Sequence, residues 1–398
     1  MSVKSDAQVG KIAKALDEFK IETASWAFAD TGTRFGKFLQ PAAAKTTAEK
    51  LADAGQVNAL TGCCPTVALH VLWDTPPGSN LADVKKLAEK YGVRPGAINP
   101  NVFQDQIYKH GGLANEQETV RKAALDHILY SVKVARELAS RDVSCWFGDG
   151  SNYPGTANIR ARKHWMAEGL KAVHDALGVD QRLLIEYKPF EPAFYHTDIG
   201  DWGMALLFAK AAGPKARVLV DTGHHYQGQN IEQIVAWLLD ENMLGGFHFN
   251  NRRYADDDLT LGSIDPYQDF RVFAEICSYA WEKSRAPDLI YMIDQSHNLK
   301  DKIEETIQTV IAAQSFFAKA ALVDHAALAK YQQKCALIDA EECLKSAFAT
   351  DVRPVLKAWR KSKGLPADPL AAFRASGYMK RITKDRAEKN AASGGSYA

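Results

Sequence analysis

The segment VLVDTGHH, residues 218–225, joins an apolar run to side chains that could bind a metal ion. Its first three residues have the composition of a short strand buried in a parallel sheet, and this strand ends on Asp221. A Thr-Gly turn follows, and then the imidazoles of His224 and His225. Carboxylate and imidazole ligands together suit manganese, cobalt, zinc or magnesium. The segment therefore predicts a strand that presents metal ligands at its C-terminal end.

The same arrangement recurs at three other places in the chain. Residues 183–185 lead to Glu186, residues 246–247 lead to His248, and residues 289–293 lead to Asp294. In a parallel α/β barrel the C-terminal ends of the strands face one mouth, where the active site lies. We therefore expect one ion to be bound by four residues from neighbouring strands: Glu186, Asp221, His248 and Asp294. The alternative is a set of buried polar side chains satisfied by backbone groups at the strand ends.

Eight strand-helix pairs in succession favour a closed (β/α)8 TIM barrel over an open doubly wound sheet. The expected strands are 21–28, 66–72, 94–98, 143–147, 183–187, 217–221, 245–249 and 289–294. After residue 318 the strands stop, and residues 319–378 have the pattern of amphipathic helices. We therefore predict an α/β fold with a barrel over residues 1–318, including an N-terminal helix, and a helical C-terminal extension over residues 319–398. The polar residues from about 388 onward are expected to form a disordered tail.

The bulk properties argue against several classes of protein. The 398 residues accommodate one barrel of about 250 residues with extensions. A formal net charge of +1 gives no general basic surface for nucleic acid. No apolar run approaches the ~18 residues that span a membrane, and the N-terminus has no apolar secretory segment. The six cysteines match no metal or redox spacing, so we expect reduced thiols in a cytoplasmic protein.

A second set of possible ligands lies on the loop after the seventh expected strand. Asp256 and Asp258 are two residues apart, and alternate side chains of an extended loop point the same way. Together with His224 they could bind a second ion, while Asp257 would point away. A solvated acidic turn would have the same sequence, and the neighbouring first cluster is what favours the metal site.

Other side chains at the expected mouth could contact a substrate. Lys188 shares the side of its strand with Glu186, so it could hold a substrate oxygen or polarise a carbonyl, or it could be a solvated lysine. His70 lies in an apolar strand, where a histidine is more often a core residue, but its position allows contact with a hydroxyl group. Aromatic rings at strand ends could stack on a sugar or could be ordinary packing residues; these are Trp26, Trp73, Phe103 and Trp146.

Segments spread along the chain together resemble L-rhamnose isomerase of the shorter, broad-specificity kind. They are 25–26 (SW) with 31–35 (TGTRF), 69–74 (LHVLWD), 146–155 (WFGDGSNYPG), 186–195 (EYKPFEPAFY), 220–225 (VDTGHH), 245–259 (GGFHFNNRRYADDDL), 292–298 (MIDQSHN), 350–356 (TDVRPVL) and 373–378 (FRASGY). The resemblance covers nearly the whole chain. It implies a (β/α)8 barrel, a homotetramer and two divalent ions, typically Mn²⁺, with Co²⁺, Mg²⁺ or Zn²⁺ as other candidates.

The resemblance also implies roles for individual residues. The ligands of a substrate-holding ion would be Glu186, Asp221, His248 and Asp294, and those of a water-holding ion would be His224, Asp256 and Asp258. The residues implied to act in catalysis are Lys188 near the sugar O1, His70 near the ring-oxygen end, and Asp256. The implied substrate lining is Trp26, Phe103 and Trp146, with Phe35 entering from a neighbouring subunit. The sequence departs from the family pattern at Tyr187, where histidine is expected, and at 251–253, where Asn-Arg-Arg replaces Asp-Ser-Lys.

The activity implied by the resemblance is conversion of L-rhamnose to L-rhamnulose, and of other aldoses such as D-allose, by a hydride shift between C1 and C2. A cis-enediol route with proton transfer is the alternative mechanism. A metal-dependent ketose 3-epimerase is the nearest rival function, although it usually needs one ion and two flanking carboxylates. A metal-dependent barrel hydrolase or nuclease would use similar ligands, and a non-catalytic sugar-binding barrel would not need the second ligand set.

Overall fold

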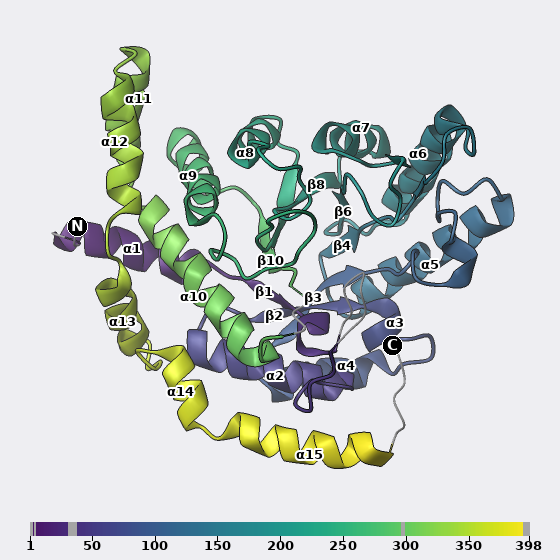
Figure 1. The fold of residues 1–398 in the computed structure, drawn as a ribbon, viewed down its shortest axis with the longest axis horizontal. Coiled ribbons are helices and arrows are strands. Elements are labelled where there is room, and N and C mark those ends of the chain that lie inside the picture. The colour runs from purple at the N-terminus through teal and green to yellow at the C-terminus, as the bar shows by residue number, and fades with distance from the viewer. Residues whose placement is uncertain (1–2, 4, 31–37, 296–298, 393–398) are drawn as a thin grey trace.

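The barrel predicted from the sequence is present in the computed structural model, which describes residue 3 and residues 5–30, 38–295 and 299–392 (Figure 1). Eight parallel strands close in the order β1-β10-β9-β8-β6-β4-β3-β2. These strands are β1 (Glu22–Ala24), β2 (Thr66–His70), β3 (Arg94–Asn99), β4 (Asp142–Cys145), β6 (Arg182–Glu186), β8 (Ala216–Asp221), β9 (Leu244–Phe249) and β10 (Ile290–Ile293). A separate antiparallel pair, β5 (Gly150–Ser151) and β7 (His196–Thr197), lies in the loops.

Helices surround the strands on the outside of the barrel (Figure 1). They are α2 (Thr47–Thr61), α4 (Leu81–Lys90), α5 (Glu118–Glu137), α6 (Ile159–Ala176), α7 (Trp202–Ala212), α8 (Ile231–Asp240), α9 (Pro266–Lys283) and α10 (Lys302–Ala320). Many are capped by side chains that accept from the first turn, as Thr46 does from the amide of Glu49 and Asp201 from that of Met204. The apolar faces of these helices pack against the outer sides of the strands and form the main core.

Two expected strands end earlier than their apolar runs. The first, expected over 21–28, stops at Ala24 and continues as the 3-10 helix η1 (Ser25–Phe28). The second, expected over 66–72, stops at His70 and continues as the short helix α3 (Val71–Asp74). Asp74 explains both endings, because its Oδ2 accepts from the Ser25 hydroxyl and, at 2.8 Å, from the His70 amide. These polar contacts override the local apolar pattern and turn both segments toward the mouth.

Inside the barrel, alanine and leucine side chains with Trp26 and Met292 form a separate core, and the acid Glu22 is buried beside it. Its Oε1 accepts from the backbone amide of Ala97 at 2.8 Å. Gly96 leaves the space that it occupies, since a Cβ at that position would lie 1.7 Å from Glu22 Oε2. Burial raises the pKa of Glu22 to about 7, and this effect is larger than that of the Ala97 hydrogen bond, which lowers the pKa.

Replacing this acid by Glu22→Gln should remove part of the pH dependence of stability. Glutamate has an ordinary pKa of 4.5, so between pH 4.5 and about 7 the folded chain binds more protons than the unfolded chain. The wild-type free energy of unfolding therefore falls as the pH rises through this window, by roughly 3 kcal/mol relative to the variant. Urea unfolding of both proteins at pH 4.5 and pH 8 measures this difference, and parallel pH dependences would contradict it.

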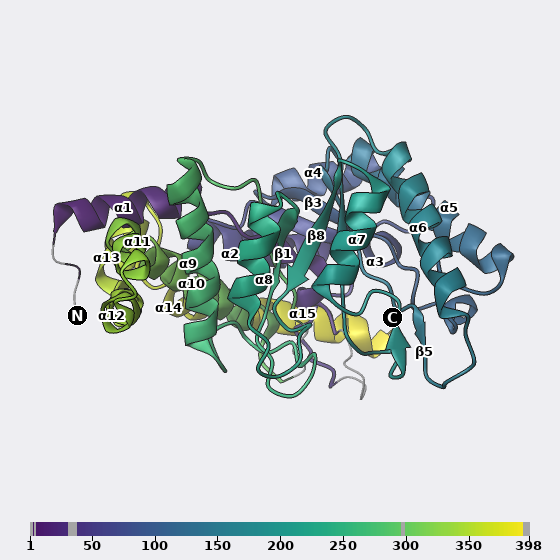
Figure 2. The same cartoon turned by 90° about the horizontal axis from the view of Figure 1, so that it is seen from above.

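The C-terminal extension is helical, as its pattern predicts, and its described part forms an arm of five helices. These are α11 (His325–Gln333), α12 (Leu337–Phe348), α13 (Arg353–Ser362), α14 (Pro369–Ala375) and α15 (Tyr378–Ala392). Helix α13 packs on the N-terminal helix α1 (Asp6–Glu18), and the Trp359 indole donates to Asp17 at 2.9 Å. From there the arm returns along the outside of the barrel toward α2 (Figures 1 and 2). Helix α15 continues past residue 388, where we expected the tail to begin, and residues 393–398 lie outside the described part.

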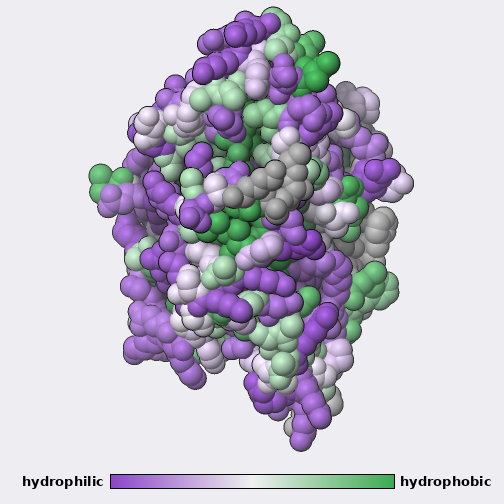
Figure 3. Space-filling model, turned by 90° about the vertical axis from the view of Figure 1, so that its left-hand side faces the viewer, coloured by the Kyte–Doolittle hydropathy of each residue, from purple (hydrophilic) through white to green (hydrophobic). Residues whose placement is uncertain are grey.

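The division into a barrel over 1–318 and an extension over 319–398 stays a prediction. Leu337 and Ile338, in the projecting part of the arm, are each 77% exposed. Figure 3 shows the face of the molecule on this side, where hydrophobic side chains lie among hydrophilic ones. In the described part of the chain no single helix is long and apolar enough to cross a membrane, although one pair bent by 60°, Lys302–Ala320 with His325–Gln333, passes that test jointly.

Candidate active site

Four adjacent strands bring the first predicted ligand set together at the mouth of the barrel. Glu186 and Asp221 end β6 and β8, His248 lies in β9, and Asp294 follows β10 directly. From His248 Nδ1 the distances are 3.2 Å to Glu186 Oε1, 3.8 Å to Asp221 Oδ2 and 3.6 Å to Asp294 Oδ2. One ligand atom from each of the four lies within 4.8 Å of the others, which is the spacing of ligands around a single ion. The C-terminal ends of four neighbouring parallel strands therefore account for this cluster.

The second set assembles around a shared carboxylate. Asp221, His224 and Asp256 also have ligand atoms within 4.8 Å of one another. His224 Nε2 lies 3.4 Å from Asp256 Oδ2 and 4.0 Å from Asp221 Oδ2, while its Nδ1 lies 2.9 Å from the backbone oxygen of Tyr187. A hydrogen bond from Nδ1 to that carbonyl leaves Nε2 free to act as a ligand. Asp221 thus stands between the two groups.

Asp258 lies at the same cavity but outside these closest sets. It lines the cavity with Asp256, as the alternation of the loop predicts, and it has a left-handed φ of 48°. Asp257 instead accepts the amides of Arg253 and Tyr254 at 2.6 and 2.7 Å and so holds the loop. Burial raises the pKa of Asp258 well above its ordinary value, and the charges of Asp256 and Asp294 add to this effect.

The charge of the cluster fits a divalent cation. Burial opposes ionisation of Glu186, but His248 and His224 outweigh it and lower its pKa to about 2. Burial raises the pKa of Asp221 to about 7, although the nearby His224 lowers it. Burial disfavours the charged form of His248, but Glu186 and other carboxylates outweigh it and raise its pKa to about 9. Without a cation, the imidazoles hold protons that balance the carboxylates, and a cation would displace those protons.

Two buried carboxylate oxygen atoms also indicate a cation site. Among the described residues, Asp221 Oδ2 and Asp256 Oδ1 are shielded from solvent and have no hydrogen-bond partner. An acceptor buried without a donor is costly unless a cation or water satisfies it. Oxygen and imidazole ligands without thiolates suit Mn²⁺, Co²⁺ or Mg²⁺. They also bind Zn²⁺, but they do not select it over the other ions. The residues present therefore fit a pair of divalent ions.

Lys188 is buried next to the second ligand set. Its Nζ lies 2.6 Å from Asp256 Oδ2 and 3.3 Å from Glu191 Oε2, and 5.3 Å from the centre of the Trp146 ring. Burial opposes its charge, but Asp256 and the other carboxylates outweigh burial and raise the pKa of Lys188. The ammonium group is therefore charged and held in the cavity, which favours a substrate contact over a solvated lysine.

Aromatic rings form the opposite wall of a cavity of about 250 Å³. The Trp26 indole donates to Asp294 Oδ1 at 2.8 Å, and Phe103 packs against Trp146 with ring centres 4.7 Å apart. His70 stacks on Trp73 at 3.8 Å, and burial lowers its pKa to about 3, so its imidazole is neutral. Phe35, the remaining residue expected at the site, lies outside the described residues.

Some residues at the site were not among the sequence-based candidates. Asn99 and Ser144 line the same cavity, and Glu191 contacts Lys188. Asn99 is the last residue of β3, so its position at a strand end could have indicated it. Ser144 lies inside β4, where an alternating apolar pattern gives no reason to single out one serine.

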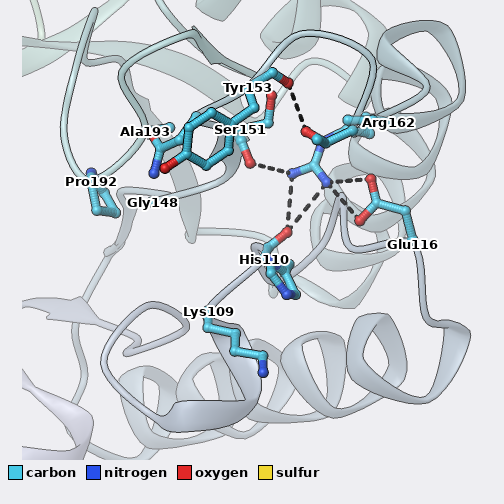
Figure 4. A pocket seen from close by; sticks show the side chains of 13 residues that line it. Lys109, His110, Glu116, Gly148, Ser151, Tyr153, Arg162, Pro192 and Ala193 are labelled. Carbon is cyan, nitrogen blue, oxygen red and sulfur yellow. Dashed lines mark hydrogen bonds and ion pairs between the residues drawn. The ribbon is translucent and has the colours of Figure 1, made fainter.

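A larger cavity of about 410 Å³ lies beside this site, between the β4–α6 connection and the loop after β6 (Figure 4). Arg162 is 1% exposed and pairs with Glu116 and Asp198, each at 2.8 Å. It also contacts the backbone oxygen of His110 at 3.3 Å. The charge of Arg162 is thus satisfied within the protein, in contrast to the buried carboxylate oxygens of the metal cluster. We therefore place the candidate active site at the barrel mouth.

Comparison with known proteins identifies the family of the barrel. A family model described as xylose isomerase-like TIM barrel matches residues 60–274, which is more than half of the chain. The chain belongs to this family. The xylose isomerase-like match spans six barrel strands, β2, β3, β4, β6, β8 and β9, and with them Glu186, Asp221 and His248.

Several individual proteins are similar to this chain in sequence or in fold. A probable sugar isomerase of Rhizobium meliloti (strain 1021) is 40% identical over 386 residues, covering 96% of this chain and 88% of the relative. A probable sugar isomerase of Mesorhizobium japonicum is 37% identical over 392 residues, covering 97% and 90%. The solved structure of an L-ribulose 3-epimerase superposes with a TM-score of 0.53 at 12% identity, covering 80% of this chain and 98% of that one, which is a likeness of fold.

Proposed function

We propose that this protein is a metal-dependent aldose–ketose isomerase that converts L-rhamnose to L-rhamnulose and also accepts other aldoses such as D-allose. The observation that carries the proposal is the pair of ligand sets that share Asp221 at one barrel mouth. Relatives named probable sugar isomerases, which match along nearly the whole chain, support the general reaction. The rhamnose preference rests on the sequence resemblance and is the finer part of the proposal.

The ions that we propose are two divalent cations, with Mn²⁺ as the best fit. Glu186, Asp221, His248 and Asp294 would hold one ion, and Asp221, His224 and Asp256, with Asp258 nearby, would hold the other. When bound, such ions polarise sugar oxygens and lower the pKa of a coordinated water. Strand ends place the ligands of the first set, and the loop that carries Asp256 is held by the hydrogen bonds of Asp257, so both positions are fixed before substrate enters.

The side chains of the cavity can then orient an open-chain sugar. Lys188 presents a charged ammonium group that can donate to O1 as negative charge develops there. Neutral His70 can exchange a hydrogen bond with a hydroxyl at the other end of the chain. Trp26, Phe103 and Trp146 cover the apolar carbon face and exclude water, which favours hydride passage from C2 to C1 within the sugar.

A ketose 3-epimerase is the second candidate function. The fold likeness to ketose 3-epimerase structures, with TM-scores of 0.53 and 0.51, gives it support. Epimerisation needs an acid–base pair on the two faces of C3, and one ion is enough to hold the ketose. The second ligand set around His224 and Asp256 is the feature that favours isomerisation.

Stripping the protein of metal and restoring Mn²⁺ tests the proposal. Purified full-length protein is treated with a chelator and incubated with L-rhamnose, D-allose and L-mannose, with and without Mn²⁺. We expect ketose formation only with the metal restored, fastest from L-rhamnose. No ketose from any aldose with Mn²⁺, Co²⁺, Mg²⁺ or Zn²⁺ would refute the isomerase function.

The proposed assembly is a homotetramer. The exposed apolar residues of the arm, Leu337 and Ile338, and the exposed pair Phe38 and Leu39 near the mouth are the surfaces that we expect to meet other subunits. Entry of Phe35 into a neighbouring site remains part of this proposal.

A further inference from the structure

The last helix of the arm is anchored on α2 by a buried ion pair. Arg386, in α15, is 4% exposed, and Asp53, in α2, is 1% exposed. The guanidinium group binds both carboxylate oxygens of Asp53, at 2.8 and 2.9 Å, and the Tyr378 hydroxyl donates to Asp53 at 2.9 Å. Two charges withdrawn from water in this geometry fix α15 at one place on the barrel.

The same guanidinium group also contacts residues 38–46, which directly precede α2. Arg386 Nη1 donates to the backbone oxygen of Ala42. Two residues later, the Ala44 amide donates to the Phe28 backbone oxygen at 2.8 Å. Phe28 ends the short helix η1 that carries Trp26, whose indole donates to the metal-ligand candidate Asp294. A continuous set of contacts therefore runs from the arm to the wall of the active site.

Helix α2 provides a second connection to the site. Lys50 lies one turn before Asp53 and pairs with Asp74 at 2.7 Å, and both partners are buried. Asp74 in turn holds the Ser25 hydroxyl and the His70 amide. Helix α2 thus contacts the arm through Asp53, and through Lys50 it contacts Asp74, which holds the ends of β1 and β2.

The segment of residues 38–46 also touches the loop on the other side of Asp294. The Gln40 side chain donates to the backbone oxygen of Lys300 at 2.8 Å. Lys45 pairs with Asp30 at 2.6 Å, which brings the two ends of the β1–α2 connection together. Residues 38–46 therefore lie between the arm and the loops at the mouth.

We propose that Arg386 is a positioning residue through which the C-terminal arm holds residues 38–46 and η1, and with them Trp26, at the substrate cavity. Arg386 acts through Ala42 and Asp53, with which it forms hydrogen bonds. Only the kinetic consequence rests on the proposed isomerase function, because the effect on backbone order can be measured without substrate.

The first test is hydrogen–deuterium exchange of the full-length protein. Arg386→Ala/Asp53→Ala removes both buried charges, so that neither is left unpaired in the core. The matched control is Arg374→Ala/Glu304→Ala, which removes an exposed ion pair of 2.6 Å between the same arm and α10. We expect amides of residues 38–46 to exchange at least about tenfold faster in the first variant, with α8 unchanged, and to stay at the wild-type rate in the control. Unchanged exchange over 38–46 in the first variant would refute the inference.

The second test separates positioning from general stability. With L-rhamnose as substrate, loss of positioning should raise KM about tenfold while kcat changes less than threefold, since the metal ligands stay in place. Arg386→Lys keeps the charge but loses the two-point contact, so its KM should lie between the wild-type and double-variant values. A lower melting temperature with unchanged KM would show a purely structural role. If the wild type turns over no sugar, the proposed function fails, and the exchange experiment still decides the inference.

Discussion

The double variant Asp256→Asn/Asp258→Asn is expected to retain one metal ion per chain and to lose at least about a hundredfold in kcat/KM. Asp256 contributes an oxygen to the set with Asp221 and His224, and its free Oδ1 is buried without a partner among the described residues. An amide supplies no negative charge to a cation, and a hundredfold loss corresponds to only about 2.7 kcal/mol of transition-state stabilisation. Metal content after dialysis and initial rates with L-rhamnose measure the two effects.

The control for this variant changes charge by the same amount at the surface. Asp126→Asn/Asp175→Asn removes two carboxylates that form exposed pairs with Lys122 and Lys171. This protein should keep wild-type metal content and turnover, because exposed pairs of this kind contribute little. Two ions and full activity in the Asp256→Asn/Asp258→Asn protein would contradict the role given to the second ligand set.

The variant Lys188→Met is expected to keep both ions and lose about 10²- to 10³-fold in kcat. Its ammonium group lies 2.6 Å from Asp256 Oδ2 and opposes binding of a cation there, so metal affinity should stay equal or rise. Turnover should fall because a buried donor to developing negative charge is lost. KM should change far less than kcat, since the interaction strengthens toward the transition state.

Calorimetric titration of Mn²⁺ and steady-state kinetics together test this prediction. Lys171→Met, which removes an exposed lysine paired with Asp175, is the matched control and should behave as wild type. Metal loss in Lys188→Met would mean that the lysine supports the ligands instead of the substrate. Full turnover would remove Lys188 from the mechanism.

Much of the barrel could be predicted because each strand leaves a local pattern of apolar residues in the sequence. A parallel strand buried on both faces is a short apolar run, and strands β6, β8 and β9 were predicted to within one residue at each end. Glu186, Asp221, His248 and Asp294 all stand at or next to strand ends, so the barrel geometry alone places them together. The early ends of β1 and β2 escaped prediction, because Asp74 meets Ser25 across 49 residues of sequence.

The features that the sequence did not predict depend on contacts between residues distant in sequence. Arg386 lies 333 residues from Asp53, and no local pattern distinguishes it from the other basic residues of α15. The sequence also does not show that both ligand sets share Asp221, because one set lies at the ends of four strands and the other adds His224 and Asp256 from the loops after β8 and β9. The β5–β7 pair was missed because each strand is only two residues long and its partner lies more than 40 residues away.

The measurement that tests the central claim most directly starts from the ketose. Wild-type protein loaded with Mn²⁺ is incubated with L-rhamnulose, and the products are identified by nuclear magnetic resonance. Isomerisation predicts that L-rhamnose accumulates to its equilibrium share, with the configuration at C3 retained in every product. Appearance of the C3-epimeric ketose without L-rhamnose would contradict the isomerase account and establish the epimerase in its place.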